Sequence, residues 1–192
     1  MSLFMRFLLL VLLAGPPSVS VALEPVHLVA DVENHEFPVF SVRPSAVIHD
    51  LRPHPEMADN NWRYEGLTQA SLELQQSLEQ TPDRCVVGSI FLRLQQEVRV
   101  PQWRPPEEPS AEMRDRWQRA RDALLAHEQT HVAYSMEAAE LLKATLESMP
   151  GDRDCETLQR AIERSYRRSL ARLSLRHAMF DARTKHGDLE DL

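Results

Sequence analysis

The chain has 192 residues, with 29 acidic and 22 basic side chains and a formal net charge of −7 at pH 7. This acidity argues against nucleic acid and anionic membrane surfaces as partners, because both repel a negatively charged chain. After the N-terminal leader, the sequence contains no apolar run long enough to cross a bilayer.

The N-terminus has the pattern of a secretory signal peptide. Arg6 precedes an apolar run from Phe7 to Ala14, and small residues continue to Ala22. The run is too short to span a bilayer, so we expect cleavage after Ala22 and a protein that is periplasmic or secreted. An uncleaved anchor is the alternative. The mature chain, residues 23–192, has the length of a single domain with a hydrophobic core.

The first half of the mature chain alternates between apolar and polar residues, as β-strands do. Short strands are expected at residues 26–32 and 37–42, and the prolines of the second suggest a sheet edge. Residues 49–61 are expected to form a loop. Residues 64–78 alternate as well, although their Leu, Gln and Glu content favours a helix, and we predict a strand there.

The clearest strand covers residues 85–100. Its even positions are mostly apolar and its odd positions mostly polar. This pattern predicts one buried and one solvated face, as in an antiparallel sheet. Pro101 is expected to end the strand, and a proline-rich connection to the helical half follows.

Two long helices are predicted in the second half. Residues 110–149 contain neither Pro nor Gly, Ser110 is a good N-cap, and Pro150-Gly151 marks a stop. Either Asp152 or Asp154 then caps a second helix, which continues into a polar C-terminal tail.

Each helix carries one apolar stripe that is expected to face the interior. In the first helix the stripe comprises Met113, Trp117, Ala120, Leu124, His127, His131, Tyr134, Ala138, Leu141 and Thr145. In the second it comprises Leu158, Ile162, Tyr166, Leu170, Leu173, His177 and Phe180. The predicted fold class is therefore α+β, with an N-terminal antiparallel β-sheet over about residues 23–100 and a two-helix hairpin over about residues 110–184.

The first helix contains an H-E-x-x-H motif, His127-Glu128-Gln129-Thr130-His131. Residues four apart on a helix lie one turn apart on one face, so both imidazoles can reach a single Zn²⁺. Both histidines lie on the apolar stripe, where a shared metal would give their nitrogens a partner. Two core histidines bonded to backbone carbonyls are the alternative.

The chain has two cysteines, Cys85 and Cys155. In an exported protein such a pair predicts one disulfide, which would tie the sheet to the second helix. A role for one cysteine as a zinc ligand is the weaker alternative, because neither belongs to a close cluster of Cys and His.

Several motifs follow one another along the chain: Cys85, Val100-Pro101-Gln102-Trp103, Trp117, His127-Glu128-x-x-His131, Cys155 and Phe180-Asp181-x-x-Thr184-x-His186-Gly187. Together they resemble a bacterial family of predicted secreted zinc-dependent proteases, catalogued as a domain of unknown function. The resemblance covers roughly residues 60–187 and implies a metallopeptidase. The chain departs from the family pattern after Gly187, where Leu189-Glu190 stands in place of the expected Gln-Gly.

A catalytic zinc usually has three protein ligands and one water. A tight turn between antiparallel helices would place His131 opposite about residue 170 and His127 opposite about residue 174, and His177 would lie about a turn from residue 174. Helix geometry therefore favours His177 as the third ligand, whereas the family resemblance favours His186 in the C-terminal signature. We select His186 first, His177 second and Glu163 third.

Other polar residues are assigned lesser roles. Asp181 and Thr184 are expected to orient a metal ligand, with solvated side chains at a helix end as the alternative. The remaining histidines are expected at the surface, and these are His27, His35, His49 and His54.

The predicted chemistry is metal-assisted hydrolysis of a peptide or a peptide-like crosslink in the cell envelope. Glu128 would act as general base toward the attacking water and then pass the proton to the leaving amine. Tyr134 is a candidate for stabilising the oxyanion, with simple packing as the alternative. Two other functions are possible: a non-catalytic envelope protein with a structural metal site, and an exported binding module without metal.

Overall fold

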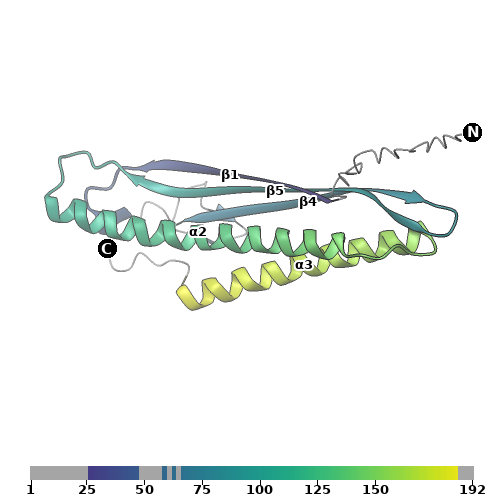
Figure 1. Ribbon diagram of the computed structural model, residues 1–192. Helices are drawn as coiled ribbons and strands as arrows, with labels where there is room; N and C mark the ends of the chain where they lie inside the picture. Colours follow the sequence, from purple (N-terminus) through teal and green to yellow (C-terminus); the bar gives the residue numbers. More distant parts are fainter. Residues whose placement is uncertain (1–25, 48–57, 60–61, 64–65, 186–192) are drawn as a thin grey trace, which may run out of the picture.

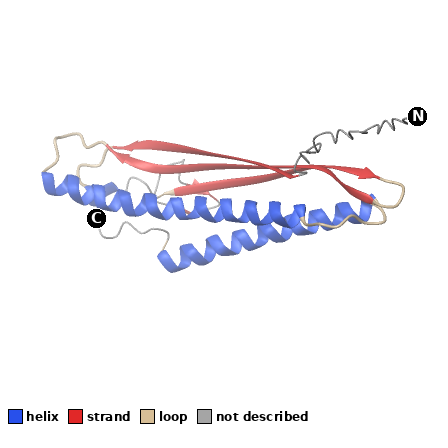
Figure 2. Ribbon diagram, in the orientation of Figure 1, coloured by secondary structure: helices blue, strands red, loops and turns tan. Residues whose placement is uncertain are grey.

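A computed structural model describes residues 26–47, 58–59, 62–63 and 66–185. The expected signal peptide, most of the loop expected over residues 49–61, and His186 lie outside these residues. Figures 1 and 2 show two layers, in which a sheet of long strands lies along a pair of long helices. In the described part of the chain, no helix is long and apolar enough to cross a membrane.

The α+β fold class is confirmed, with the sheet N-terminal to the helices. The elements in chain order are β1 (Val26–Val39), the 3₁₀ helix η1 (Pro44–Ala46), β2 (Ala58–Asp59), β3 (Trp62–Arg63), β4 (Leu67–Gln80), β5 (Cys85–Trp103), α2 (Ala111–Glu147) and α3 (Cys155–Thr184). The strand predicted over residues 64–78 is therefore confirmed as β4, despite its helix-favouring composition.

The main sheet has the strand order β1-β5-β4 and is mixed. β4 pairs antiparallel with β5 across a short turn, whereas β1 pairs with β5 in parallel. The prediction of a wholly antiparallel sheet was therefore wrong for β1. A parallel neighbour requires a crossover of a dozen or more residues, which the chain between β1 and β4 supplies. Alternation of apolar residues reveals a strand's faces but not its direction.

Two prolines lie inside strands, which corrects two predicted boundaries. β1 continues through Pro38 as one strand, because it is an edge strand and one of its sides needs no donor. β5 continues through Pro101 to Trp103. The Arg104 N–H donates to the Val39 carbonyl at 2.8 Å. Even-numbered residues of β5 therefore direct their backbone N–H and C=O groups toward β1. Pro101 therefore directs its backbone nitrogen toward the β4 side, beyond Leu67 and Arg99, the last β4–β5 pair in the described part of the chain.

Helix α2 begins as the sequence predicts, since the Ser110 hydroxyl accepts a hydrogen bond from the Met113 N–H. Up to His131 the buried positions follow the predicted stripe, with the addition of Glu128. Beyond it the buried residues are Ser135, Ala139, Leu142 and Leu146, each one position after the predicted one. Leu141, predicted to be buried, is 60% exposed. The sheet twists along its length, so its line of contact rotates around the straight helix.

Two groups of buried side chains hold the layers together. One group comprises Phe37, Val39, Val47, Val98, Val100, Trp103, Trp117 and Leu124. The other comprises Val26, Leu72, Cys85, Ile90, Leu92, Leu94, Ala139, Leu142, Leu146, Leu158 and Ile162. Along α2 the first group ends at Leu124 and the second begins at Ala139. The H-E-x-x-H motif lies between the two groups, where the apolar packing is interrupted.

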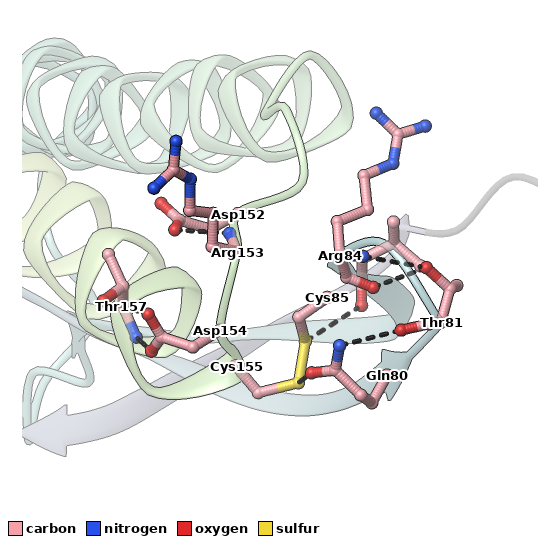
Figure 3. The surroundings of a disulfide bond; sticks show 10 residues. Gln80, Thr81, Arg84, Cys85, Asp152, Arg153, Asp154, Cys155 and Thr157 are labelled. Carbon is pink, nitrogen blue, oxygen red and sulfur yellow. Dashed lines mark hydrogen bonds between the residues drawn. A yellow bond between two sulfur atoms is a disulfide. The ribbon is translucent and has the colours of Figure 1, made fainter.

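A disulfide joins Cys85 to Cys155 and confirms the predicted pair, with a Cα–Cα distance of 5.1 Å (Figure 3). Beside it, the N–H of Cys85 donates to the Asp152 carbonyl at 2.7 Å and the Asp152 N–H returns a bond at 2.9 Å. Of the two candidate caps, Asp154 is the N-cap of α3, because its side chain accepts from the Thr157 N–H. The end of the hairpin is thus fixed to the first residue of β5.

The two helices pair with a different offset from the one predicted. His131 contacts His177 rather than lying opposite residue 170, which is a displacement of about two helical turns. The chain leaving α2 runs on to pair Asp152 with Cys85 before α3 begins. As a result α3 starts beyond the end of α2, and its C-terminal turns reach the H-E-x-x-H motif.

Candidate metal centre

Three side-chain donor atoms from the two helices converge at one point. On α2, the Nε2 atoms of His127 and His131 are 3.1 Å apart. From α3, Asp181 brings its Oδ1 to 3.2 Å from the first of these atoms and 2.8 Å from the second. The two histidines are buried and Asp181 is half-buried. Within the part of the chain that the structure describes, these three side chains form a group that could hold a metal ion.

The spacing of these atoms fits a tetrahedral metal. Zn²⁺ lies about 2.0–2.2 Å from nitrogen and oxygen ligands, so two ligand atoms in a tetrahedron are about 3.3 Å apart. The three observed separations, 2.8–3.2 Å, are close to this value. A carboxylate between two imidazoles is also a donor set that suits divalent zinc.

The outer nitrogen of His127 contacts Thr184. Its Nδ1 is 3.2 Å from the Thr184 hydroxyl, and that hydroxyl donates to the Phe180 carbonyl at 2.8 Å. Because the hydroxyl proton is already committed, the imidazole must donate from Nδ1. The Nε2 lone pair then points toward His131 and Asp181, which is the tautomer a metal ligand requires.

The outer nitrogen of His131 contacts His177. The two Nδ1 atoms are 2.6 Å apart, and the far nitrogen of His177 is 3.4 Å from the Ser135 hydroxyl, which donates to the His131 carbonyl at 3.1 Å. Burial, together with the neighbouring His131, lowers the pKa of His177 to about 4, although the charge of Asp181 acts in the opposite direction. A neutral His177 can therefore accept the Nδ1 proton of His131, which leaves the His131 Nε2 lone pair for a metal.

Phe180 packs against both metal-facing imidazoles. Its ring stacks on His127 with centroids 4.6 Å apart and meets the edge of His131 at 5.2 Å. Each imidazole is thus held by a ring contact and by a hydrogen bond at its outer nitrogen. Such constraint fixes the direction of both lone pairs.

Glu128 lies beside this cluster and is only 2% exposed. The Thr68 hydroxyl, from β4, donates to its Oε2 at 2.6 Å. Burial raises the pKa of Glu128 to about 7, with the bond from Thr68 acting in the opposite direction and the charge of Asp181 adding to the rise. A carboxyl group with this pKa exchanges protons readily near neutral pH, as a general base must.

Gly66 makes room for that carboxylate. A Cβ atom at this position would lie 2.6 Å from Glu128 Oε1 and 2.9 Å from the Leu124 side chain. Any other residue would displace Glu128, so the start of β4 approaches the motif as closely as glycine allows.

A cleft of about 610 Å³ opens onto the cluster. It lies between β4 on one side and the facing stretches of α2 and α3 on the other. Its lining residues are Gly66, Leu67, Thr68, Gln69, Ala70, His127, Glu128, His131, Leu170, Leu173, Ser174, His177 and Asp181. The cluster is therefore reachable from outside, as a catalytic metal site must be.

The candidates for a third ligand lie in different places. His186 lies outside the described residues, so its role stays a prediction. His177 contacts the outer nitrogen of His131, and Glu163 pairs with Arg167 at 3.0 Å. Neither is among the converging donors, whereas Asp181, expected to orient a ligand, is.

Several other residues complete the comparison with the sequence predictions. Tyr134 has its ring beneath the Arg176 guanidinium at 3.8 Å. His27 stacks on Phe91, and His35 is about half exposed beside two glutamates. His49 and His54 lie outside the described residues. Thr68, Gly66 and Ser135 were missed because none of them belongs to a recognisable motif.

One protein-family model covers most of the described fold. The model of the family described as "Bacterial protein of unknown function (DUF922)" matches residues 34–187. The chain belongs to this family. The match includes β4, β5, both helices and every residue of the cluster, but the DUF922 description assigns no function. Searches of curated proteins and of solved structures found no match to the chain.

Proposed function

We propose that this DUF922 protein is an exported zinc-dependent peptidase. The observation that carries the proposal is the convergence of two imidazole nitrogens and one carboxylate oxygen within a cleft, with a buried carboxylate alongside. His127, His131 and Asp181 would hold the metal, and His186 is the sequence-based candidate for a further ligand. The Cys85–Cys155 disulfide supports export, because such bonds persist in oxidising compartments.

When bound at this site, zinc would lower the pKa of a water molecule and polarise the scissile carbonyl. Glu128 would take the proton from the attacking water and deliver it to the leaving amine. Thr68 holds one carboxylate oxygen of Glu128, at 2.6 Å, and so fixes the orientation of the other. Thr184 and His177 set the tautomers of the two imidazoles so that their Nε2 lone pairs face the metal position, and Phe180 packs against both rings.

The open cleft favours catalysis over a purely structural metal site. Structural zinc sites are closed, with four protein ligands and no access for substrate. Here a cleft of about 610 Å³ reaches the cluster. A structural site also predicts that removing the metal unfolds the protein, whereas a catalytic site predicts lost turnover in a folded chain.

The test combines elemental analysis with two variants. Protein purified without a histidine tag is expected to contain about one zinc per chain and to hydrolyse unstructured peptides until a chelator is added. Glu128→Gln keeps the shape of the side chain and is expected to lower kcat at least a hundredfold while zinc content stays unchanged. Glu140→Gln, an exposed glutamate on the same helix, is the matched control. Full activity of Glu128→Gln, or protein that never binds metal, would refute the proposal.

A further inference from the structure

The outer edge of β4 forms one wall of the cleft. β4 is at one side of the sheet order β1-β5-β4, and its residues Leu67 to Ala70 line the cavity beside Glu128. An edge strand presents backbone N–H and C=O groups on the side that has no neighbouring strand. Which residues of β4 present these groups follows from the sheet register.

Even-numbered residues of β4 direct their backbone groups outward. Even residues of β5 direct their backbone groups toward β1, as the bond from Arg104 to Val39 shows. Odd residues of β5 therefore direct their backbone groups toward β4. Gln69 lies opposite Glu97 in the antiparallel register, so it faces β5. Its neighbours Thr68 and Ala70 consequently direct their N–H and C=O groups away from the sheet.

Tyr166 provides an independent observation of the same edge. Its hydroxyl, from α3, donates to the Leu72 carbonyl, which therefore points outward as the register requires. Tyr166 occupies the edge at that residue. Among the described residues, the outward backbone groups of Thr68 and Ala70 have no such partner, and they lie between Tyr166 and the metal cluster.

We infer that an extended peptide adds to β4 at Thr68 and Ala70 as an additional strand. The two outward residues are about 7 Å apart, the repeat of a strand, and only another extended backbone matches donors and acceptors at that spacing. A bound peptide would lie across the mouth of the cleft, beside Glu128. Its inward side chain would meet Leu170 and Leu173, so apolar residues are favoured there.

This inference deepens the proposed function and rests on it for the identity of the site. It names the substrate class as an unfolded or extended polypeptide segment, recognised mainly through its backbone. It also assigns Tyr166 the role of ending the peptide ladder at Leu72, which limits the number of substrate residues held on that side of the cluster.

The test uses the full mature chain carrying Glu128→Gln, which prevents turnover, and fluorescein-labelled decapeptides of randomised sequence. Peptide binding is expected to slow amide hydrogen exchange at Thr68 and Ala70 at least tenfold. Leu74, whose N–H also faces outward but lies beyond Tyr166, is expected to exchange at an unchanged rate. The same protection at Leu74, or none at Ala70, would overturn the inference.

A second measurement uses a variant of the edge. Ala70→Pro removes one outward N–H that bonds nothing in β5, and proline is tolerated on edge strands. It is expected to weaken peptide binding about tenfold relative to Ala70→Val, which has a similar volume and keeps the N–H. If Ala70→Pro fails to fold, decapeptides methylated on their backbone nitrogens replace it and are expected to bind about tenfold more weakly to the unaltered edge. Equal binding of methylated and unmethylated peptides would overturn the inference.

The outcomes separate this inference from the proposed function. Protection at Thr68 and Ala70, combined with no peptide hydrolysis by the unaltered protein, supports the binding edge and refutes the peptidase. Hydrolysis without protection at these amides supports the peptidase and overturns the binding edge.

Discussion

Replacing His177 tests how the metal ligands are held. The Nδ1 of His131 lies 2.6 Å from the Nδ1 of His177, so in His177→Leu the Nδ1 proton of His131 would lose its acceptor in a buried environment. Leaving a buried donor without a partner costs about 1–3 kcal/mol, and loss of such an outer partner typically weakens metal binding about 10–100-fold. We expect zinc affinity to fall within this range.

The conservative variant separates an orienting role from a ligand role. In His177→Asn the side-chain oxygen can occupy the position of the imidazole Nδ1 and accept the same proton. An orienting role predicts that Asn restores most of the zinc affinity that Leu loses. A ligand role, the second choice from the sequence, predicts that both variants lose it, because an amide is a poor zinc ligand.

The assay is a zinc competition titration against a chromogenic chelator at pH 7.5, with thermal melting of the metal-free proteins as a control. Unchanged zinc affinity in His177→Leu would refute the reasoning. A metal-free His177→Leu protein that melts far below the parent protein would also refute it. The loss of zinc affinity would then reflect a damaged fold rather than a misoriented His131.

Two further predictions concern the third ligand and the disulfide. Asp181→Asn is expected to lower zinc affinity at least a hundredfold by equilibrium dialysis, because it removes a charged donor, and an equal or larger loss in His186→Gln alone would instead favour the histidine. Replacing Cys85 and Cys155 together by Ala is expected to lower the free energy of unfolding by about 4 kcal/mol, since the bridge closes a loop with a sequence separation of 70. Urea denaturation measures this loss, and equal midpoints for the two proteins would contradict it.

Local signals allowed the helices to be predicted well. Ser110 caps α2 as expected, because an N-cap hydroxyl acts on a backbone N–H only three residues away. The same is true of Asp154 on α3. The cysteine pair was equally predictable, since a chain with two cysteines has one possible intramolecular pairing. Each of these predictions depends on the identity of nearby residues or on a simple count.

Features that depend on how elements are arranged were harder to predict. The parallel direction of β1 leaves no trace in its apolar alternation, because both directions bury the same face. The offset between the helices depends on the seven residues between Glu147 and Cys155, which extend to reach Cys85 instead of turning tightly. That offset brings Asp181 to His131, and a tight turn would have placed residue 170 there.

The role of Thr68 shows what a motif requires from the rest of a fold. A buried carboxylate needs a hydrogen-bond donor, and the neighbours of Glu128 one turn away on its own helix include the apolar Leu124 and Val132. The donor must therefore come from another element packed on this face of α2. Of the even positions of β4 from 68 to 76, which point their side chains toward the helices, only Thr68 carries a hydroxyl. The H-E-x-x-H motif and the pattern of this strand together thus narrow the donor to the Thr68 hydroxyl and the Gln76 amide, and the packing of β4 on α2 brings Thr68 to Glu128.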